Sequence, residues 1–161
     1  MKISKVHLYN FRQFYGQVEI DLLTDSNRNI ILIGGKNGFG KTNFLISIVW
    51  CLYGEKITQI DENFKREVQK ESNYQKFIRQ SLNWNSKDEG NSNFSVEIYF
   101  EEVDYPANIK VSDGKIIVKR EFNATKIDEK LSVLNSSRNE LFAEQEDKSN
   151  FINDYLIPLE A

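Results

Sequence analysis

Alternating hydrophobic and polar residues mark three segments of the chain. Residues 3–8 place Val6 and Leu8 on one face, and residues 17–22 repeat the alternation with Val18 and Ile20 on the apolar side. Residues 94–100 alternate in the same way. Because successive side chains of a strand point to opposite faces, these segments are typical of antiparallel strands that face a core on one side and water on the other.

A different pattern surrounds residues 29–54. Residues 29–34 form a continuous apolar run rich in isoleucine, which predicts a strand covered on both faces, as in a parallel sheet. Residues 41–53 are almost entirely apolar after Asn43, which predicts a helix buried on all sides that ends at Gly54. A glycine-rich loop therefore lies between a predicted buried strand and a predicted buried helix.

The rest of the chain predicts a mixture of helices, turns and strands. Residues 61–84 indicate polar helices with a break near Ser72 and Asn73, and residues 86–92 indicate a surface loop. Residues 106–122 predict a hairpin that turns at residues 113–114.

Two further segments follow the predicted hairpin. Thr125 resembles the capping residue of a helix over residues 127–141, whose apolar positions recur at helical spacing. Residues 151–159 form a strongly apolar final segment.

Composition favours a single globular domain over residues 1–161, because 40% hydrophobic and 28% charged residues suffice for one core. No stretch approaches the roughly 18 apolar residues of a membrane helix, and the first residues lack the apolar core of a signal peptide. We therefore expect a cytoplasmic protein with no membrane partner. One cysteine, Cys51, and one histidine, His7, cannot form an internal disulfide and argue against a structural zinc site. We expect Cys51 to be buried and His7 to lie at the surface.

The net charge of −3 gives no global basic footprint of the kind that small nucleic-acid-binding domains show. Basic residues outnumber acidic ones in residues 1–90, and the reverse holds in residues 91–161. Any polyanion should therefore meet the first half of the chain.

The glycine-rich loop carries the clearest chemistry, because residues 35–42 match G-x-x-x-x-G-K-[ST] at every fixed position. Its backbone N–H groups should point into a phosphate-sized hollow at the positive end of the following helix. Lys41 is predicted to reach the β- and γ-phosphates of ATP and to be the catalytic residue, and the Thr42 hydroxyl to bind Mg²⁺. The alternative is an incidental glycine-rich turn with a solvated lysine. The predicted nucleotide-binding residues of the loop are Gly35, Lys36, Asn37, Gly38, Phe39, Gly40, Lys41, Thr42 and Asn43.

A P-loop alone does not choose among kinases, GTPases, transporter ATPases and DNA-repair ATPases. Kinases and GTPases usually carry the loop after their first strand, whereas two antiparallel strands precede it here. This order favours a mixed α/β nucleotide domain with an antiparallel layer, which a transporter subunit could share.

The loop and its neighbours resemble the N-terminal ATPase lobe of the SMC-like family, which has ABC-type heads and includes the SMC proteins, RecF, RecN and DndD. The resemblance rests on residues 3–14 with Asn10-Phe11-Arg12, on residues 35–43, and on residues 48–54 (IVWCLYG). Within the family the chain is most similar to DndD, the ATPase of bacterial DNA phosphorothioation. That finer likeness is carried by residues 77–83, 94–100, 118–120 and 151–158.

The resemblance implies an α/β P-loop NTPase fold and an ATPase head that dimerises head to head with ATP and Mg²⁺ in the interface. It also implies contact with DNA and with other proteins of a DNA modification or nuclease complex, in the bacterial cytosol or nucleoid. Arg12 resembles the family arginine that approaches the nucleotide. The alternative is a surface arginine that stacks on its aromatic neighbours. Gln145 is the candidate for the glutamine that completes the Mg²⁺ shell, although its local sequence departs from the family pattern.

Several family motifs are missing from residues 1–161. The signature motif, the acidic strand end that supplies the catalytic carboxylate, and the switch histidine all follow a long coiled coil in the family. We therefore expect the N-terminal half of a split head, with the coiled coil and the C-terminal half absent. Such a lobe should hydrolyse ATP only with its own C-terminal half and after dimerisation.

Other functions stay open at this point. DNA double-strand-break repair or antiphage defence fits the same head, a small P-loop kinase or transporter ATPase is a further alternative, and a degenerate loop in an interaction module is another. Contact with DNA has candidates in the polar helices, although the residues themselves favour a solvated face with paired charges. These candidates are Lys65, Arg66, Lys70, Lys76 and Arg79.

Overall fold

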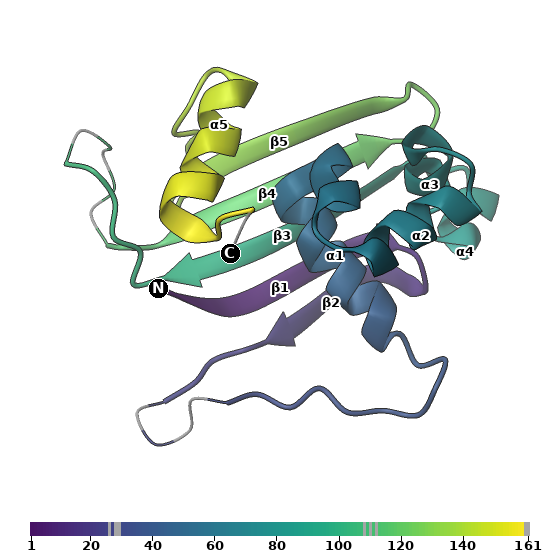
Figure 1. The fold of residues 1–161 in the computed structure, drawn as a ribbon, viewed down its shortest axis with the longest axis horizontal. Helices are drawn as coiled ribbons and strands as arrows, with labels where there is room; N and C mark the ends of the chain where they lie inside the picture. Colours follow the sequence, from purple (N-terminus) through teal and green to yellow (C-terminus); the bar gives the residue numbers. More distant parts are fainter. Residues whose placement is uncertain (26, 28–29, 108, 110, 112, 160–161) are drawn as a thin grey trace.

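The computed structural model describes residues 1–25, 27, 30–107, 109, 111 and 113–159. The described residues form an antiparallel five-stranded sheet with the order β2-β1-β3-β4-β5 (Figure 1). The strands are β1 (Lys2–Phe11), β2 (Phe14–Asp21), β3 (Asn93–Glu101), β4 (Ile116–Asn123) and β5 (Asp128–Asn135). The alternating segments at residues 3–8, 17–22 and 94–100 are therefore confirmed as strands.

Helices cover one face of this sheet (Figure 1). The central helix α1 packs over β1, β3 and β4, while α5 lies against β5. The elements are α1 (Lys41–Tyr53), the 3₁₀ helix η1 (Gly54–Gln59), α2 (Glu62–Lys70), α3 (Tyr74–Arg79), α4 (Trp84–Asp88), α5 (Gln145–Phe151) and the π-helix η2 (Ile152–Leu156). Among the described residues, no helix is long and apolar enough to cross a membrane.

The core lies between α1 and the covered face of the sheet. Val6 and Leu8 of β1 are buried there, as the alternation predicts. Trp50 of α1 stacks on Phe11 with ring centroids 5.7 Å apart and lies 5.3 Å from the ring of Phe94. Aromatic side chains of this size contribute most of the buried apolar area, so this cluster fixes α1 on the sheet.

A buried ion pair holds the C-terminal end of α1. The Arg120 guanidinium, on β4, donates from Nε to the carbonyl of Cys51 at 3.0 Å and from Nη1 to Glu129 Oε1 at 2.8 Å. Tyr74 donates its hydroxyl to the other Glu129 oxygen at 2.7 Å. A cation at the negative end of a helix is favourable. Gly54 follows at φ 55°, and a Cβ there would lie 2.6 Å from Arg120 Nη1.

The helix over residues 41–53 is confirmed, although Leu45 is 51% exposed, so the helix is not buried on all sides. The break in the polar helices is also confirmed. Ser72 has φ 76°, and Asn73 caps α3 by accepting the N–H of Lys76 at 2.9 Å. The predicted surface loop at residues 86–92 is wrong in its first part, because α4 begins at Trp84 and buries Ser86.

The predicted buried strand at residues 29–34 is wrong for its described part. Residue 29 lies outside the described residues, and residues 30–34 form no strand, with Ile30 77% and Leu32 91% exposed. A strand needs a neighbour to pair its backbone N–H and C=O groups. No strand among the described residues pairs with this run. The apolar composition of residues 30–34 is that of a buried strand, but a strand also needs a neighbouring strand, which the local sequence cannot supply.

The predicted helix over residues 127–141 is also wrong, because residues 128–135 form β5 in register with β4. Leu131 and Val133 are both buried, and their spacing of two fits a strand as well as the longer stripe fits a helix. Thr125 lies in the β4–β5 turn, where its N–H bonds to Asn123 Oδ1 at 3.0 Å. Residues 128–135 form a strand and not a helix because β4 pairs with their backbone N–H and C=O groups.

The predicted hairpin at residues 106–122 is corrected in the same way. Only its second half is a strand, β4, which pairs with β3 and β5. Residues 108, 110 and 112 lie outside the described residues. Gly114 does take a positive φ of 67°. Its carbonyl accepts the N–H of Val103 at 3.0 Å, and this hydrogen bond joins the two ends of the β3–β4 connection.

Candidate nucleotide-binding site

The glycine-rich loop leads directly into α1, as its motif requires. Gly38 and Gly40 have φ values of 86° and 91°, a region that residues with a side chain rarely adopt. The loop turns where the N–H of Phe39 meets the carbonyl of Lys36 at 3.3 Å. The first helical bond of α1 runs from the N–H of Phe44 to the carbonyl of Gly40 at 2.8 Å. The loop and helix of the predicted context are therefore present, whereas the described residues 30–34 before the loop form no strand.

The N-terminus of α1 is arranged to receive an anion. In the described part of the chain, no side chain caps this end, and its first turn carries no acidic residue. The first N–H groups of a helix have no partner within the helix, and they carry the positive end of its dipole. The backbone at residues 41–43 therefore has free donors where a phosphate would bind.

Lys41 folds back over its own loop. Its Nζ donates to the carbonyl of Gly35 at 2.6 Å and to that of Lys36 at 2.9 Å. These contacts place a positive charge beside the uncapped helix end, where phosphate oxygens are better acceptors than neutral carbonyls. Thr42 is exposed on the first turn of α1. The donors fit the phosphates of ATP, and the Thr42 hydroxyl is an oxygen ligand of the kind Mg²⁺ prefers.

Arg12 occupies the tight turn between β1 and β2, at φ 50°. Its N–H donates to the carbonyl of Ser81 at 2.6 Å, and its carbonyl accepts from Asn83 Nδ2 at 2.6 Å. The guanidinium lies over the Phe77 ring, 5.0 Å from the centroid, and Nη1 donates to Asn43 Oδ1 at 2.8 Å. Arg12 therefore joins the β1–β2 turn, the α3–α4 segment and the start of α1.

Burial is the main influence on Arg12 and lowers the pKa of its guanidinium, while Glu67 and Glu71 act in the opposite sense. Arginine keeps its charge in proteins, so the side chain stays cationic. Arg12 and Asn43 line a cavity of about 220 Å³ together with Glu71, Phe77 and Gln80. The structure thus brings Arg12 next to the P-loop helix, in contact with Asn43, the residue that follows the motif.

Gln13 is a site residue that the sequence did not single out. Its Oε1 accepts a hydrogen bond from Asn43 Nδ2, and a Cβ on Gly40 would lie 1.6 Å from its Nε2. The turn residues Arg12 and Gln13 therefore hold both ends of the Asn43 amide. In the sequence, the only indication of this role is that Gln13 follows Arg12 directly.

Gln145 lies elsewhere. It is the first residue of α5, and its Nε2 donates to the carbonyl of Leu131 on β5 at 3.2 Å. Helix α5 covers the β5 side of the sheet, away from the start of α1 (Figure 1), and Thr42 lies in the first turn of α1. The structure does not bring Gln145 and Thr42 together, and the Mg²⁺ role of Gln145 stays a prediction.

Four of the five basic candidates in the polar helices divide into two groups, and the fifth, Arg66, is exposed on α2. Lys65 and Lys70 pair with Glu62 and Glu67 three residues earlier, as a solvated helix face would. Lys76 and Arg79 instead line a cavity that also contains Arg12.

The AAA domain family matches residues 5–160 of the chain. Among curated proteins, none matches significantly. A solved structure from work on ATP-driven dimerization and DNA stimulated activation of SMC ATPases aligns with a TM-score of 0.60 at 16% identity, over 93% of this chain and 76% of that one. The SmcHead bound to the C-winged helix domain of ScpA aligns with a TM-score of 0.55 at 15% identity, over 93% of this chain.

The chain spans 39% of the length of the SmcHead chain that it matches. At these sequence identities the two structures show the fold alone. They confirm the predicted mixed α/β architecture, in which the P-loop helix packs over an antiparallel layer. The chain therefore belongs to the AAA domain family and has the fold of an SMC-type ATPase head.

Proposed function

We propose that this chain is the ATP-binding lobe of an SMC-like, DNA-associated ATPase. The observation that carries the proposal is the uncapped N-terminus of α1 with Lys41 folded beside it and Arg12 bonded to Asn43. Lys41 neutralises the phosphate charge, the backbone of residues 41–43 donates to it, and the Thr42 hydroxyl holds Mg²⁺. Bound Mg²⁺ offsets charge that develops on the phosphates during hydrolysis.

The test is a calorimetric titration of the chain with Mg-ATP. We expect binding by the parent and a loss of at least about tenfold in affinity for Lys41→Ala, because the ammonium is the only side-chain cation that the loop motif fixes. Lys56→Ala removes an equal charge in η1, outside the loop, and should bind as the parent does. Equal affinity of the Lys41 and Lys56 variants, or no binding by the parent, would contradict the proposal.

We further propose that residues 1–161 are the N-terminal half of a split head, completed by a C-terminal half and by head-to-head dimerisation. The exposed apolar run at residues 30–33 supports this, since it has the composition of a buried strand but no partner among the described residues. We expect slow ATP turnover by the chain and faster turnover when a polypeptide with the SMC-type signature motif is added. Rapid turnover by the chain alone would contradict a split head.

We also propose that this ATPase acts in DNA phosphorothioation or a related modification or restriction pathway, and the sequence resemblance to DndD supports this proposal. The test is the phosphorothioate content of genomic DNA in cells that carry the parent gene or Lys41→Ala. A fall in sulfur content with the variant supports that pathway. Unchanged content with increased sensitivity to double-strand breaks would instead support a repair role.

A further inference from the structure

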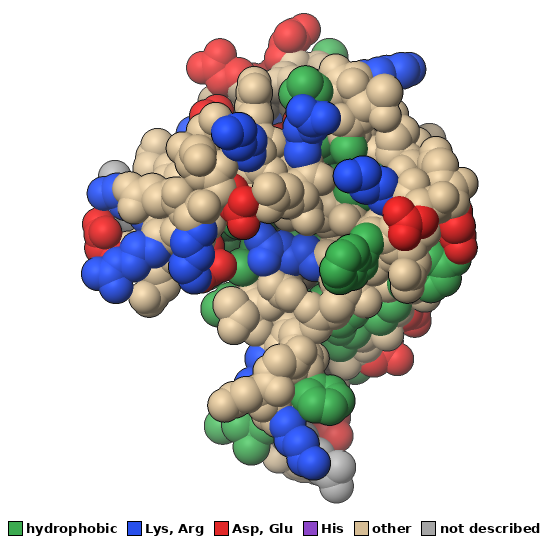
Figure 2. Space-filling view, turned by 90° about the vertical axis from the view of Figure 1, so that its right-hand side faces the viewer, with side chains coloured by type: hydrophobic (Ala, Val, Ile, Leu, Met, Phe, Trp, Pro, Cys, Tyr) green, Lys and Arg blue, Asp and Glu red, His purple; other side chains and the backbone are tan. Residues whose placement is uncertain are grey.

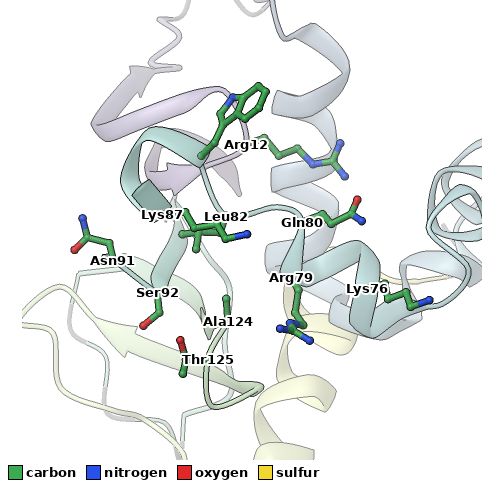
Figure 3. Close-up of a pocket in the computed structure, with 11 residues that line it drawn as sticks. Arg12, Lys76, Arg79, Gln80, Leu82, Lys87, Asn91, Ser92, Ala124 and Thr125 are labelled. Atoms are coloured by element: carbon green, nitrogen blue, oxygen red, sulfur yellow. The ribbon is translucent and has the colours of Figure 1, made fainter. Parts of the chain in front are cut away.

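A large open cleft lies beside the candidate nucleotide site. It has a volume of about 910 Å³ and lies between α3, α4 and the β4–β5 turn, with Arg12 in its wall (Figure 3). Figure 2 shows lysine and arginine side chains gathered on this side of the molecule, with fewer acidic ones among them. The cleft differs from the smaller cavity at Asn43, although Arg12 and Gln80 line both.

The charge of the cleft is positive. Its lining includes Arg12, Lys76, Arg79 and Lys87 and contains no aspartate or glutamate. Among the described residues, none of these four side chains makes an ion pair, whereas Lys65 and Lys70 of α2 do. Unpaired cations around a hollow raise the local concentration of a polyanion. The remaining polar lining, which includes Asn91, Ser92 and Thr125, can donate to phosphate or sugar oxygens.

An exposed tryptophan completes the lining. Trp84 is 75% exposed, whereas Trp50, the only other tryptophan of the chain, is fully buried. The backbone next to Trp84 is fixed by Asn83, whose Nδ2 donates to the carbonyl of Arg12 and whose Oδ1 accepts the N–H of Ser86 at 3.2 Å. The indole ring of Trp84 is therefore available to solvent beside the cations of the cleft.

We propose that this cleft binds single-stranded nucleic acid, with a base stacked on Trp84 and the flanking phosphates on Lys76, Arg79 and Lys87. Aromatic platforms combined with basic grooves bind unpaired strands without sequence preference. A concave site with one ring favours an unpaired base, because both faces of a paired base are covered by its neighbours in a duplex. The proposal deepens the DNA-associated role proposed above, but it does not depend on ATP binding.

The first experiment uses the fluorescence of Trp84, with short oligothymidine as the probe. Since Trp50 is buried, added strand should quench mainly the Trp84 emission. The affinity should fall with rising salt, because phosphate contacts release counterions. A duplex of mixed sequence should bind more weakly than oligothymidine of the same length. Unchanged emission, or tighter binding of the duplex, would overturn the proposal.

Variants then assign the contacts, measured by anisotropy of a labelled oligothymidine. Trp84→Ala should weaken binding roughly tenfold, and Trp84→Phe should keep most of it, because each retained stack contributes to affinity. Lys76→Ala combined with Arg79→Ala should weaken binding and reduce the slope of log affinity against log salt concentration by about 1.4, since each phosphate contact on a single strand contributes about 0.7. The matched control, Lys65→Ala with Lys70→Ala, removes the same charge outside the cleft and should change little.

Each remaining outcome is decisive. If the control pair weakens binding as much as the cleft pair, the attraction is general and the cleft is not the site. If an oligoglutamate peptide displaces the strand at lower concentration than free oligothymidine does, the cleft is a site for an acidic protein segment. A Mg-ATP titration on Trp84→Ala separates the two proposals, since ATP binding should match that of the parent while strand binding falls.

Discussion

Arg12 Nη1 donates a 2.8 Å hydrogen bond to Asn43 Oδ1, which joins the β1–β2 turn to the first turn of the P-loop helix. The two residues are far apart in sequence, and Asn43 also donates to Gln13 of the same turn. The amide of Asn43 is thus held at both ends. This contact keeps a half-buried cation close to the predicted phosphate site.

The Arg12–Asn43 bond should appear as a coupling energy. Asn43→Ala removes the acceptor and should lower the free energy of unfolding by about 1 to 2 kcal/mol, since a half-buried charged donor loses its partner. Combining Asn43→Ala with Arg12→Ala should cost less than the sum of the two single variants. Urea unfolding of the three variants measures this double-mutant cycle. Strict additivity would show that the bond does not contribute to stability.

Gly54 should tolerate a side chain poorly, because its φ is 55° and a Cβ would lie 2.6 Å from Arg120 Nη1 and 2.9 Å from Glu129 Oε1. Gly54→Ala should destabilise the fold by about 1 to 3 kcal/mol from the positive-φ backbone alone, plus the cost of displacing the ion pair. Gly90→Ala is the matched control, because Gly90 has φ 85° and nothing within 4 Å of the added Cβ. Equal losses of stability in thermal unfolding would contradict a role for the ion pair.

Arg120 and Glu129 form an ion pair at 2.8 Å with side chains 10% and 22% exposed. Arg120→Ala should cost about 3 kcal/mol of unfolding free energy, because it leaves a poorly solvated carboxylate and uncaps α1. Lys115→Ala breaks an exposed contact to Glu101 at 3.8 Å and should change stability by less than about 1 kcal/mol. Similar effects of the two variants on urea unfolding would show that Arg120 contributes no more than a surface charge.

Cys51 gives the fold a pH dependence on the alkaline side. Burial raises the pKa of its thiol to about 12. Because the folded protein holds this proton more tightly than the unfolded chain, the stabilisation is complete below the usual thiol pKa and is lost as pH rises toward 12. Unfolding free energy should therefore fall between about pH 9 and 12, and less steeply in Cys51→Ala. Identical slopes for the parent and Cys51→Ala would contradict this assignment.

The same burial predicts that Cys51 is chemically inert. Its Sγ contacts the carbonyl of Val96 at 3.3 Å within the core. Only a thiolate reacts readily with disulfide reagents, so labelling of the native chain at pH 8 should be slow and should accelerate in urea. Rapid labelling of the folded chain would show that α1 opens locally.

Local sequence determined the features that depend only on backbone conformation and on the periodicity of apolar residues. Gly38 and Gly40 take positive φ values within the glycine-rich loop, and Gly54 ends α1 at the predicted residue. Val6 and Leu8 face the core because a strand alternates its side chains. These features depend on backbone conformation and on periodicity, which a sequence carries directly.

Tertiary structure decided the features that depend on a neighbouring strand or on a contact with a distant segment. Residues 128–135 became β5 because β4 lies beside them, although their apolar spacing also suited a helix. Residues 30–34 have the composition of a buried strand but remain exposed without a neighbouring strand among the described residues. The contact of Arg12 with Asn43 and the cleft around Trp84 join segments distant in sequence. The sequence by itself determined the glycine-rich loop, which is predicted to bind phosphate, and the helix that follows it, while only the fold, through backbone pairing and long-range contacts, decided what surrounds them.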